Sequence, residues 1–232
     1  MNKPIAVVTG GGTGIGRAVA EELHRSGMRV RCLGMDMDMD APGELEFAKT
    51  DVTAPDAVRV ALADLDEVAV LVNAAGIIRH EGREFTPEGF RSVLDVNLCG
   101  TQILINALQE RLIASAGAVV NVASMWSFFG SEKNPAYATS KAGIVGLTRS
   151  YAVALAARGV RVNAVAPGWI RTRLSAAALD DPARSDAIMA RLPMRRWGTP
   201  HEVARVVRFL CSEDSQYVTG VVLPVDGGFS VA

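Results

Sequence analysis

Short apolar runs that alternate with longer helical stretches constrain the fold of this chain more than any other feature of its sequence. Runs rich in β-branched residues predict strands at 5–9, 29–33, 45–49, 68–72, 118–123, 160–165 and 221–225. Helical stretches separate most of them, at 14–26, 55–65, 87–113, 135–158 and 200–211. Strands that are apolar throughout are typical of a parallel sheet with both faces buried. The alternation predicts one α/β domain over residues 1–232, a doubly wound parallel sheet of about seven strands with helices on both faces.

Length, charge and composition narrow the class of protein. A chain of 232 residues, 49% of them hydrophobic, is long enough for one buried core and short for two domains. Lys and Arg number 24 and Asp and Glu 25, so no excess of positive charge favours a nucleic-acid partner. No apolar run approaches the roughly 20 residues of a membrane span, so we expect no membrane partner. Three cysteines without a common spacing, and no segment of targeting character, predict a cytoplasmic protein with reduced thiols.

Two groups of polar residues bear on a metal site, and neither favours one. The three histidines, His24, His80 and His201, lack ligand spacing. Residues 35–40 alternate methionine and aspartate, and the three aspartates raise the alternative of a cation site. Only about eleven residues separate the flanking strands, too few for a crossover helix, so the sequence favours a solvated loop there. We therefore expect no metal.

A glycine-rich segment, residues 9–16, follows the first predicted strand and opens the first predicted helix. Glycines let the backbone turn tightly and approach a pyrophosphate, whose charge the helix N-terminus stabilises. A plain tight turn is the alternative, but the order strand, glycines, helix is the one that a nucleotide site requires. We therefore predict nucleotide binding, with contacts from Gly10, Gly12, Thr13, Gly14, Ile15 and Gly16.

Unusual residues also follow several of the other predicted strands. Asp51 and Val52 come after the third, residues 73–76 after the fourth, Ser124 after the fifth and residues 167–172 after the sixth. Ligands of open parallel sheets bind outside the carboxyl ends of the strands. Each segment alone could be a turn, but together they predict one site at this edge of the sheet.

Tyr137 and Lys141 stand four residues apart in a predicted helix and therefore lie on one face of it. A tyrosine in water has a pKa of about 10, too high for a general base near neutral pH. A neighbouring ammonium favours the phenolate, so we expect Lys141 to lower that pKa. Ser124 offers a hydroxyl to a substrate oxygen at the same edge. A surface Tyr–Lys pair is the alternative, which Ser124 and the glycine-rich segment disfavour.

These segments together resemble the motifs of the short-chain dehydrogenase/reductase family. The matching positions span nearly the whole chain: 9–16, 73–76, Asn97, Ser124, Tyr137-Ala-Thr-Ser-Lys141, 167–168, 217–220 and 225–228. The resemblance implies a Rossmann fold and hydride transfer between a nicotinamide cofactor and an alcohol or ketone carbon.

The resemblance also implies roles for single residues. Tyr137 would be the general acid/base, Ser124 would orient the substrate oxygen, and Lys141 would bind the nicotinamide ribose and lower the Tyr137 pKa. Asn97 would complete the catalytic set by holding a water of the proton relay through the helix backbone. Further cofactor contacts would come from Asp51 and Val52 (adenine), Asn73, Ala74 and Gly76 (adenosine side), Pro167 and Gly168, and Ile170 and Thr172 (carboxamide).

Three positions depart from the family pattern. The usual Asn-Asn-Ala-Gly reads Asn73-Ala74-Ala75-Gly76, which loses an amide that braces the sheet in relatives. The chain from Asp51 to Asn73 is about four residues short, which predicts a trimmed surface helix. The position that discriminates between cofactors is Gly34-Met35, neither the acid of NAD users nor the Arg of NADP users. Asp36 would accept from ribose hydroxyls and repel a 2′-phosphate, so the sequence favours NAD.

The substrate is less constrained. Segments 77–79, 124–130 and 191–198 look similar to sugar-acid members of the family, the 2-dehydro-3-deoxy-gluconate and gluconate 5-dehydrogenases. Candidate partners for a substrate carboxylate are Arg79, Arg171, Arg173, Arg195 and Arg196. Alternatively, Trp126, Phe129 and Trp169 line an apolar pocket for a cyclic or aromatic ketone, or pack the core. Residues 174–197 lie where the family keeps a mobile helical lid.

Two other readings stay open at this point. One is a reductase of 3-ketoacyl groups bound to acyl carrier protein, because the C-terminal motifs are shared. The other is a non-catalytic nucleotide-binding regulator, which the complete set of Asn97, Ser124, Tyr137 and Lys141 disfavours. By family analogy we also expect a homo-oligomer, a dimer or tetramer, with the helices around Asn97 and Tyr137 at one interface and residues 222–232 at another.

Overall fold

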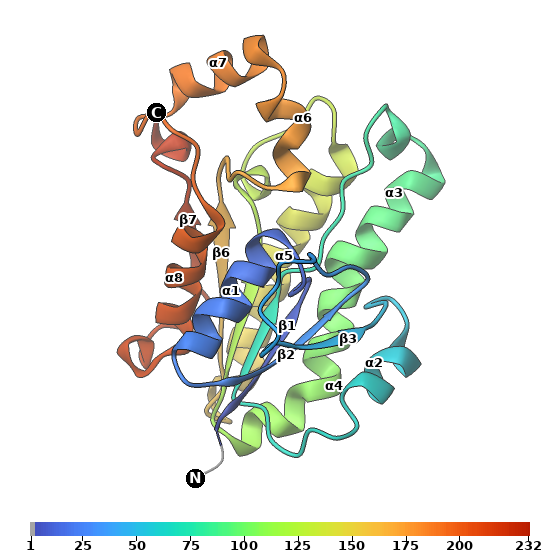
Figure 1. Ribbon diagram of the computed structural model, residues 1–232, viewed down its shortest axis with the longest axis vertical. Coiled ribbons are helices and arrows are strands. Elements are labelled where there is room, and N and C mark those ends of the chain that lie inside the picture. Colours follow the sequence, from blue (N-terminus) through green and yellow to red (C-terminus); the bar gives the residue numbers. More distant parts are fainter. Residues whose placement is uncertain (1–2) are drawn as a thin grey trace.

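The protein contains one sheet of seven parallel strands, seen in a computed structural model that describes residues 3–232 (Figure 1). The strands are β1 (Ile5–Thr9), β2 (Arg29–Gly34), β3 (Glu46–Lys49), β4 (Val70–Asn73), β5 (Ala118–Val122), β6 (Arg161–Pro167) and β7 (Val222–Val225). Their order in the sheet is β3-β2-β1-β4-β5-β6-β7, and every neighbouring pair is parallel. The predicted single α/β domain with seven strands is therefore confirmed.

Helices cover both faces of the sheet (Figure 1). The helices α1 (Gly14–Arg25) and α8 (Pro200–Cys211) pack against one face. The other face is covered by α2 (Pro55–Ala61), α4 (Gly100–Ala114) and α5 (Pro135–Ala156), with α3 (Pro87–Leu94) packed on α5. Two shorter helices, α6 (Ala176–Leu179) and α7 (Pro182–Arg191), lie at one end of the molecule (Figure 1). Within the described part of the chain, no helix is long and apolar enough to cross a membrane.

The strands are apolar on both sides because the sheet separates two hydrophobic cores. Val8 packs with residues of α1 and α8, whereas its neighbour Val7 packs with residues of α2 and α4. Both valines have no exposed surface, which confirms the inference from their continuous apolar runs. A third, smaller cluster lies apart from both cores and includes Met125, Ala178, Ile188, Leu192, Trp197 and Phe229.

The strand order reverses between β1 and β4, which pair directly. Successive connections leave in opposite directions at such a point, so a crevice opens at the carboxyl ends of the two strands. The glycine-rich segment after β1 and residues 74–76 after β4 form its two sides. This is the edge at which the sequence predicts a site.

The predicted helix at 87–113 is interrupted. Between α3 and α4, residues Asp95–Cys99 form a π-helical turn. The Thr101 hydroxyl donates to the Asn97 carbonyl at 3.1 Å, and the Asn97 side chain is held by the segment after β4. The sequence pattern did not reveal this break, since apolar spacing continues through it.

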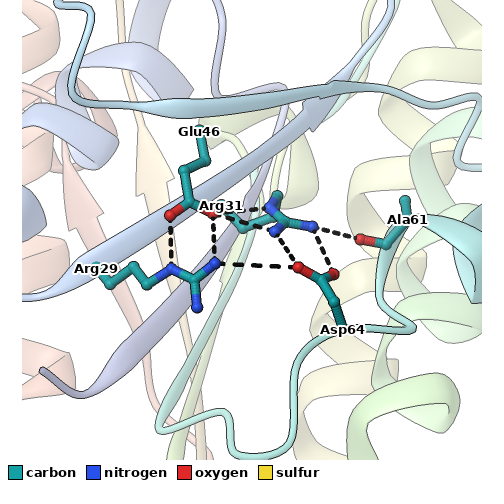
Figure 2. Close-up of polar contacts among 5 residues, drawn as sticks. All are labelled: Arg29, Arg31, Glu46, Ala61 and Asp64. Carbon is teal, nitrogen blue, oxygen red and sulfur yellow. Dashed lines mark hydrogen bonds and ion pairs between the residues drawn. The ribbon is translucent and has the colours of Figure 1, made fainter. Parts of the chain in front are cut away.

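Ion pairs hold the far edge of the sheet together (Figure 2). Arg31 of β2 contacts Asp64 at 2.8 Å and Glu46 of β3 at 3.1 Å, and it donates to the Ala61 carbonyl at 2.8 Å. Arg29 contacts Glu46 at 2.5 Å. Hydrogen bonds from Arg29 and Arg31 hold the pKa of Glu46 below its usual range. The cluster joins the β2–β3 edge to the end of α2, which stops at Ala61, four residues before the predicted end at residue 65.

Candidate active site

A cavity of about 350 Å³ opens at the carboxyl ends of β1, β4, β5 and β6. This cavity is lined by most of the residues that the sequence predicts for the site. They are Gly10, Thr13, Gly14, Ile15, Gly16, Ala74, Gly76, Ser124, Tyr137, Lys141, Pro167, Gly168, Ile170 and Thr172. Residues from four strand ends are therefore brought together in one space, although they lie far apart in the sequence.

The remaining predicted residues lie outside this cavity: Gly12, Asp36, Asp51, Val52, Asn73 and Asn97. Asn73 turns into the sheet, where its side-chain nitrogen donates to Asn121 Oδ1 at 2.9 Å. Asn121 in turn donates to Thr148 Oγ1 at 3.0 Å. The amide chain braces β4, β5 and α5, so the side chain predicted to contact a cofactor has a structural role. Val52 packs against Gly100 of α4.

The glycine-rich segment folds so tightly that side chains would not fit at two positions. A Cβ on Gly16 would lie 2.2 Å from the Gly10 carbonyl oxygen, and one on Gly12 would lie 2.1 Å from the Asp36 carbonyl oxygen. Within this segment Thr13 is the N-cap residue of α1, and its side chain makes no capping hydrogen bond. The helix N-terminus therefore faces the cavity without its own cap, which fits a phosphate-bearing cofactor.

Tyr137 lies in the first turn of α5 and is 8% exposed. Burial raises the pKa of Tyr137 to about 12, and a hydrogen bond with Ser124 opposes the rise. A buried phenolate loses its hydration, which explains the direction. In the protein alone Tyr137 is therefore protonated at neutral pH and available as a proton donor beside Ser124.

Lys141 lies one turn further along α5 and is 4% exposed. Its Nζ atom donates to the Val122 carbonyl at 2.6 Å and lies 5.6 Å from the centre of the Tyr137 ring. Burial lowers the pKa of Lys141 to about 8. The sequence predicts that Lys141 lowers the Tyr137 pKa, but here burial of the phenol is the larger effect and the pKa rises.

Asn97 is held in the π-helical turn with its side chain toward the segment after β4. Its Oδ1 accepts from the Ile77 amide at 2.8 Å, and its Nδ2 donates to the Ile77 carbonyl at 3.1 Å and to Ser140 Oγ at 3.0 Å. A Cβ on Gly76 would lie 3.4 Å from Asn97 Oδ1 and 3.6 Å from Lys141 Nζ. The absence of a side chain at Gly76 thus lets Asn97 and Lys141 approach the same point.

The loop of residues 35–40, which we call the acidic loop, packs over the glycine-rich segment. The Asp38 amide donates to the Gly12 carbonyl at 3.0 Å. Arg17 of α1 contacts Asp40 at 2.5 Å and Asp38 at 3.4 Å, and Arg173 contacts Asp38 at 3.4 Å. The segment is a loop, as predicted, but two of its aspartates are paired with arginines rather than simply solvated, because α1 and the segment after β6 bring cations to it.

Aromatic side chains line the other side of the cavity. Trp126 and Trp169 meet edge to face with ring centres 6.2 Å apart, and Trp169 meets Trp197 at 5.6 Å in the same way. Of the arginines considered for a substrate carboxylate, Arg173 lines the cavity, although it also contacts Asp38 at 3.4 Å, whereas Arg196 lies outside the cavity and is paired with Glu202 at 2.6 Å. The structure therefore narrows the candidate carboxylate partners.

Glu84 is a buried residue that the sequence analysis missed. It has no exposed surface and accepts a hydrogen bond from the Tyr137 amide at 2.9 Å. In the sequence it reads as one more surface acid before a helix, since its partner is 53 residues away. No local pattern could have distinguished it.

The described residues contain no group of three or more His, Cys, Asp or Glu that could hold a metal ion. The three cysteines at 32, 99 and 211 are free thiols.

Comparison with known proteins gives a consistent result. A family model described as "Enoyl-(Acyl carrier protein) reductase" matches residues 10–230. The 2-dehydro-3-deoxy-D-gluconate 5-dehydrogenase of Bacillus subtilis is 36% identical over 97% of this chain and 93% of its own length. The 3-oxoacyl-[acyl-carrier-protein] reductase FabG of Aquifex aeolicus is 35% identical over 97% of this chain and 96% of its own.

Among solved structures, this chain is similar to a Beutenbergia cavernae protein assigned as an NAD(P)-dependent gluconate 5-dehydrogenase, with NADP bound at low occupancy. The two are 39% identical with a TM-score of 0.92, and the match covers 100% of this chain and 98% of that chain.

Proposed function

Because the chain belongs to the short-chain dehydrogenase/reductase family and is an oxidoreductase of that family, we propose that it interconverts a secondary alcohol and a ketone with Tyr137 as general acid/base. The observation that supports this most is the single cavity that contains Ser124, Tyr137, Lys141 and the glycine-rich segment. A nicotinamide cofactor, when bound, supplies or accepts the hydride.

Four side chains of the cavity and the π-helical turn have separate roles in the proposed reaction. Tyr137, protonated at neutral pH, gives its proton to the carbonyl oxygen during reduction and takes it back during oxidation. Ser124 donates a hydrogen bond to the same oxygen and favours its developing charge. Lys141, a buried ammonium, binds ribose hydroxyls. Asn97, which binds the backbone of Ile77 in the π-helical turn, holds a water that relays protons through the helix backbone.

We propose NAD as the preferred cofactor. The acidic loop covers the glycine-rich segment, and its net charge remains negative after pairing, because Arg17 and Arg173 face three aspartates at positions 36, 38 and 40. A 2′-phosphate adds negative charge and is disfavoured there. The Beutenbergia protein contains NADP, so NAD preference rests on the loop of this chain alone. An Asp36→Ala variant that keeps the same preference for NAD over NADP would remove the argument.

For the substrate we propose a sugar acid or polyol. Relatives named as 2-dehydro-3-deoxy-D-gluconate 5-dehydrogenases support this, as does Arg173, an arginine that lines the cavity. The tryptophans at 126 and 169 suit the apolar face of a sugar ring as well as a cyclic ketone. Residues 174–197, which include α6 and α7, would form the lid. Leu174 and Ser175 line the cavity, and the two helices pack in the third hydrophobic cluster, apart from the two cores of the sheet.

We also propose a cytoplasmic homo-oligomer, a dimer or tetramer. Val153 on α5 is 82% exposed and Val231 near the C-terminus is 88% exposed, and both lie in the segments expected at interfaces. A monomer in light scattering at micromolar concentration would contradict this. The free thiols support a reducing compartment.

The test of the function is a screen of sugar acids, polyols and cyclic ketones with NADH and NADPH, following loss of cofactor absorbance. We expect turnover with at least one sugar-acid carbonyl and none in a Tyr137→Phe variant, which keeps the ring but not the hydroxyl. Equal rates in the variant, or no turnover by the wild type, would overturn the assignment, and the second result would favour a non-catalytic regulator.

The relatives named FabG favour one second candidate, a reductase of carrier-bound 3-ketoacyl groups. Acetoacetyl-coenzyme A in the same screen separates the two. If the protein turns over this thioester faster than any sugar acid, we would assign it as a 3-ketoacyl reductase instead of a sugar-acid dehydrogenase.

A further inference from the structure

Glu84 is a buried acid that the proposed mechanism does not use. It lies in a short 3-10 turn, Arg83–Phe85, and its exposed fraction is 0%. Val93 and Ala136, both without exposed surface, belong to the apolar cluster around Tyr137 beside it. A carboxylate in such surroundings is costly unless every oxygen has a partner. The partners therefore indicate why the acid is there.

Both oxygens of Glu84 accept from N–H groups. Oε2 accepts from the Tyr137 amide at 2.9 Å. Oε1 accepts from the Arg79 amide at 3.0 Å and from the Asn134 side chain at 3.5 Å. One carboxylate thus joins the segment after β4, which lines the cavity at Ile78, to the first turn of α5.

The first turn of α5 depends on this contact. Asn134 occupies the N-cap position but makes no capping hydrogen bond with its side chain, and Pro135 has no amide hydrogen. An amide at the third position of a helix commonly donates to the N-cap side chain. The Tyr137 amide donates instead to Glu84, which lies 53 residues earlier in the sequence. Negative charge is also favoured at a helix N-terminus. Glu84 is therefore a cap supplied from a distant part of the chain.

We propose that Glu84 is a positioning residue for Tyr137: it fixes the backbone from which the phenol reaches Ser124 and ties that backbone to the wall of the substrate cavity. This inference rests on the proposed oxidoreductase function. Tyr137 is then positioned from two sides: Ser124 after β5 binds its hydroxyl, and Glu84 on the 3-10 turn binds its backbone amide.

The charge of Glu84 also bears on the phenol. After burial, which is the largest effect, the negative charge of Glu84 contributes to the raised Tyr137 pKa, and the hydrogen bond with Ser124 opposes it. The ionisable groups around Tyr137 are thus Glu84 and the buried ammonium of Lys141. Removing the Glu84 charge should let Tyr137 ionise at lower pH.

Glu84→Gln tests the proposal, because it keeps the shape and one acceptor but removes the charge. In alcohol oxidation we expect kcat to fall about tenfold with the KM for the cofactor within about twofold. We expect the midpoint of the pH profile to move about half a unit toward acid. A purely structural role would lower activity or stability without moving the midpoint.

Two further variants serve as controls. Glu202→Gln removes another carboxylate that caps a helix, at the N-terminus of α8, where Glu202 accepts from the Thr199 amide at 2.8 Å. It should leave the midpoint unchanged. Glu84→Asp restores the charge but not the reach, so we expect the wild-type midpoint with a low kcat, and it also tests the proposal should the Gln variant not fold.

Amide hydrogen exchange gives a readout that needs no turnover. We expect the Tyr137 amide to exchange at least about tenfold faster in Glu84→Asp, whose shorter side chain does not reach it, than in the wild type, with the centre of α5 unchanged. If the wild type has no activity but the variant loses protection of this amide, the proposed function fails and the capping contact stands. An unchanged exchange rate, or an unmoved pH midpoint in an active Gln variant, would overturn the positioning role.

Discussion

Replacing Lys141 with methionine should separate what this lysine does for activity from what it costs the fold. Its side chain is 4% exposed, and burial lowers the pKa from 10.5 to about 8. A shift of this size corresponds to about 3 kcal/mol of destabilisation at neutral pH. Methionine removes that cost but leaves the Val122 carbonyl without its donor, at about 1–3 kcal/mol. We expect Lys141→Met to be inactive and about 0–2 kcal/mol more stable than the wild type at neutral pH.

The pH dependence is the sharper measurement. A lysine whose folded pKa is lowered binds fewer protons in the folded than in the unfolded state between about pH 8 and 10.5, so stability rises with pH in that window. The wild type should therefore gain about 1 kcal/mol relative to the variant between about pH 7 and pH 9.

Urea unfolding of both proteins without cofactor, at three pH values across this range, measures the difference. Comparing the two proteins cancels the contributions of Cys32 and Cys211, whose pKa values burial raises to about 12. This reasoning would be refuted if the free energies of unfolding of the two proteins changed equally with pH. It would also be refuted if the variant were less stable than the wild type by more than about 2 kcal/mol at neutral pH.

Three further substitutions test other contacts. Asn121→Ala should lower the free energy of unfolding by about 2–4 kcal/mol, because it removes the buried partner of Asn73 and Thr148; a loss below about 1 kcal/mol in urea unfolding would contradict the brace. Arg31→Met should make the protein less sensitive to acid. Hydrogen bonds from Arg29 and Arg31 hold the pKa of Glu46 low, and Arg31 does so for Asp64, so this stability is present above about pH 4 and lost as pH falls through the lowered values. Melting temperatures of wild type and variant should converge in acid, and a constant gap would count against the ion pairs. Gly16→Ala should weaken nucleotide binding about tenfold or more in a fluorescence titration with NADH, because the added Cβ would lie 2.2 Å from the Gly10 carbonyl oxygen; unchanged affinity would show that the turn can relax.

Much of the fold could be predicted because each strand and helix has its signal within a few residues. The continuous apolar runs predict the parallel sheet. Thr199 and Glu202 have the spacing of a capping box at the start of α8, and Thr199 does accept from the Glu202 amide. Gly27 follows the C-cap residue of α1 and has a φ of 96°, in the left-handed region where glycine commonly ends a helix. Tyr137 and Lys141 share a helix face by spacing alone. Local chemistry determines all of these features.

The features that could not be predicted depend on contacts between distant segments. The π-helical turn forms where Asn97 binds Ile77, 20 residues earlier, and Glu84 caps a helix that begins 51 residues later at Pro135. Arg17 is 23 residues from Asp40, so the acidic loop reads as a solvated run of charge. The Tyr137 pKa was predicted in the wrong direction because spacing reveals the neighbouring ammonium but not the depth of burial.

The third hydrophobic cluster has a consequence for how such a protein can change. Ile188 and Leu192, in the segment that we propose as the lid, pack with Trp197 and Phe229 in a cluster that shares no buried residue with the two cores on the faces of the sheet. Substitutions in this third cluster therefore leave the packing against the two faces of the sheet unchanged. New specificities can therefore accumulate above the reaction centre while the rest of the molecule keeps its stability, and the catalytic groups stay where they are.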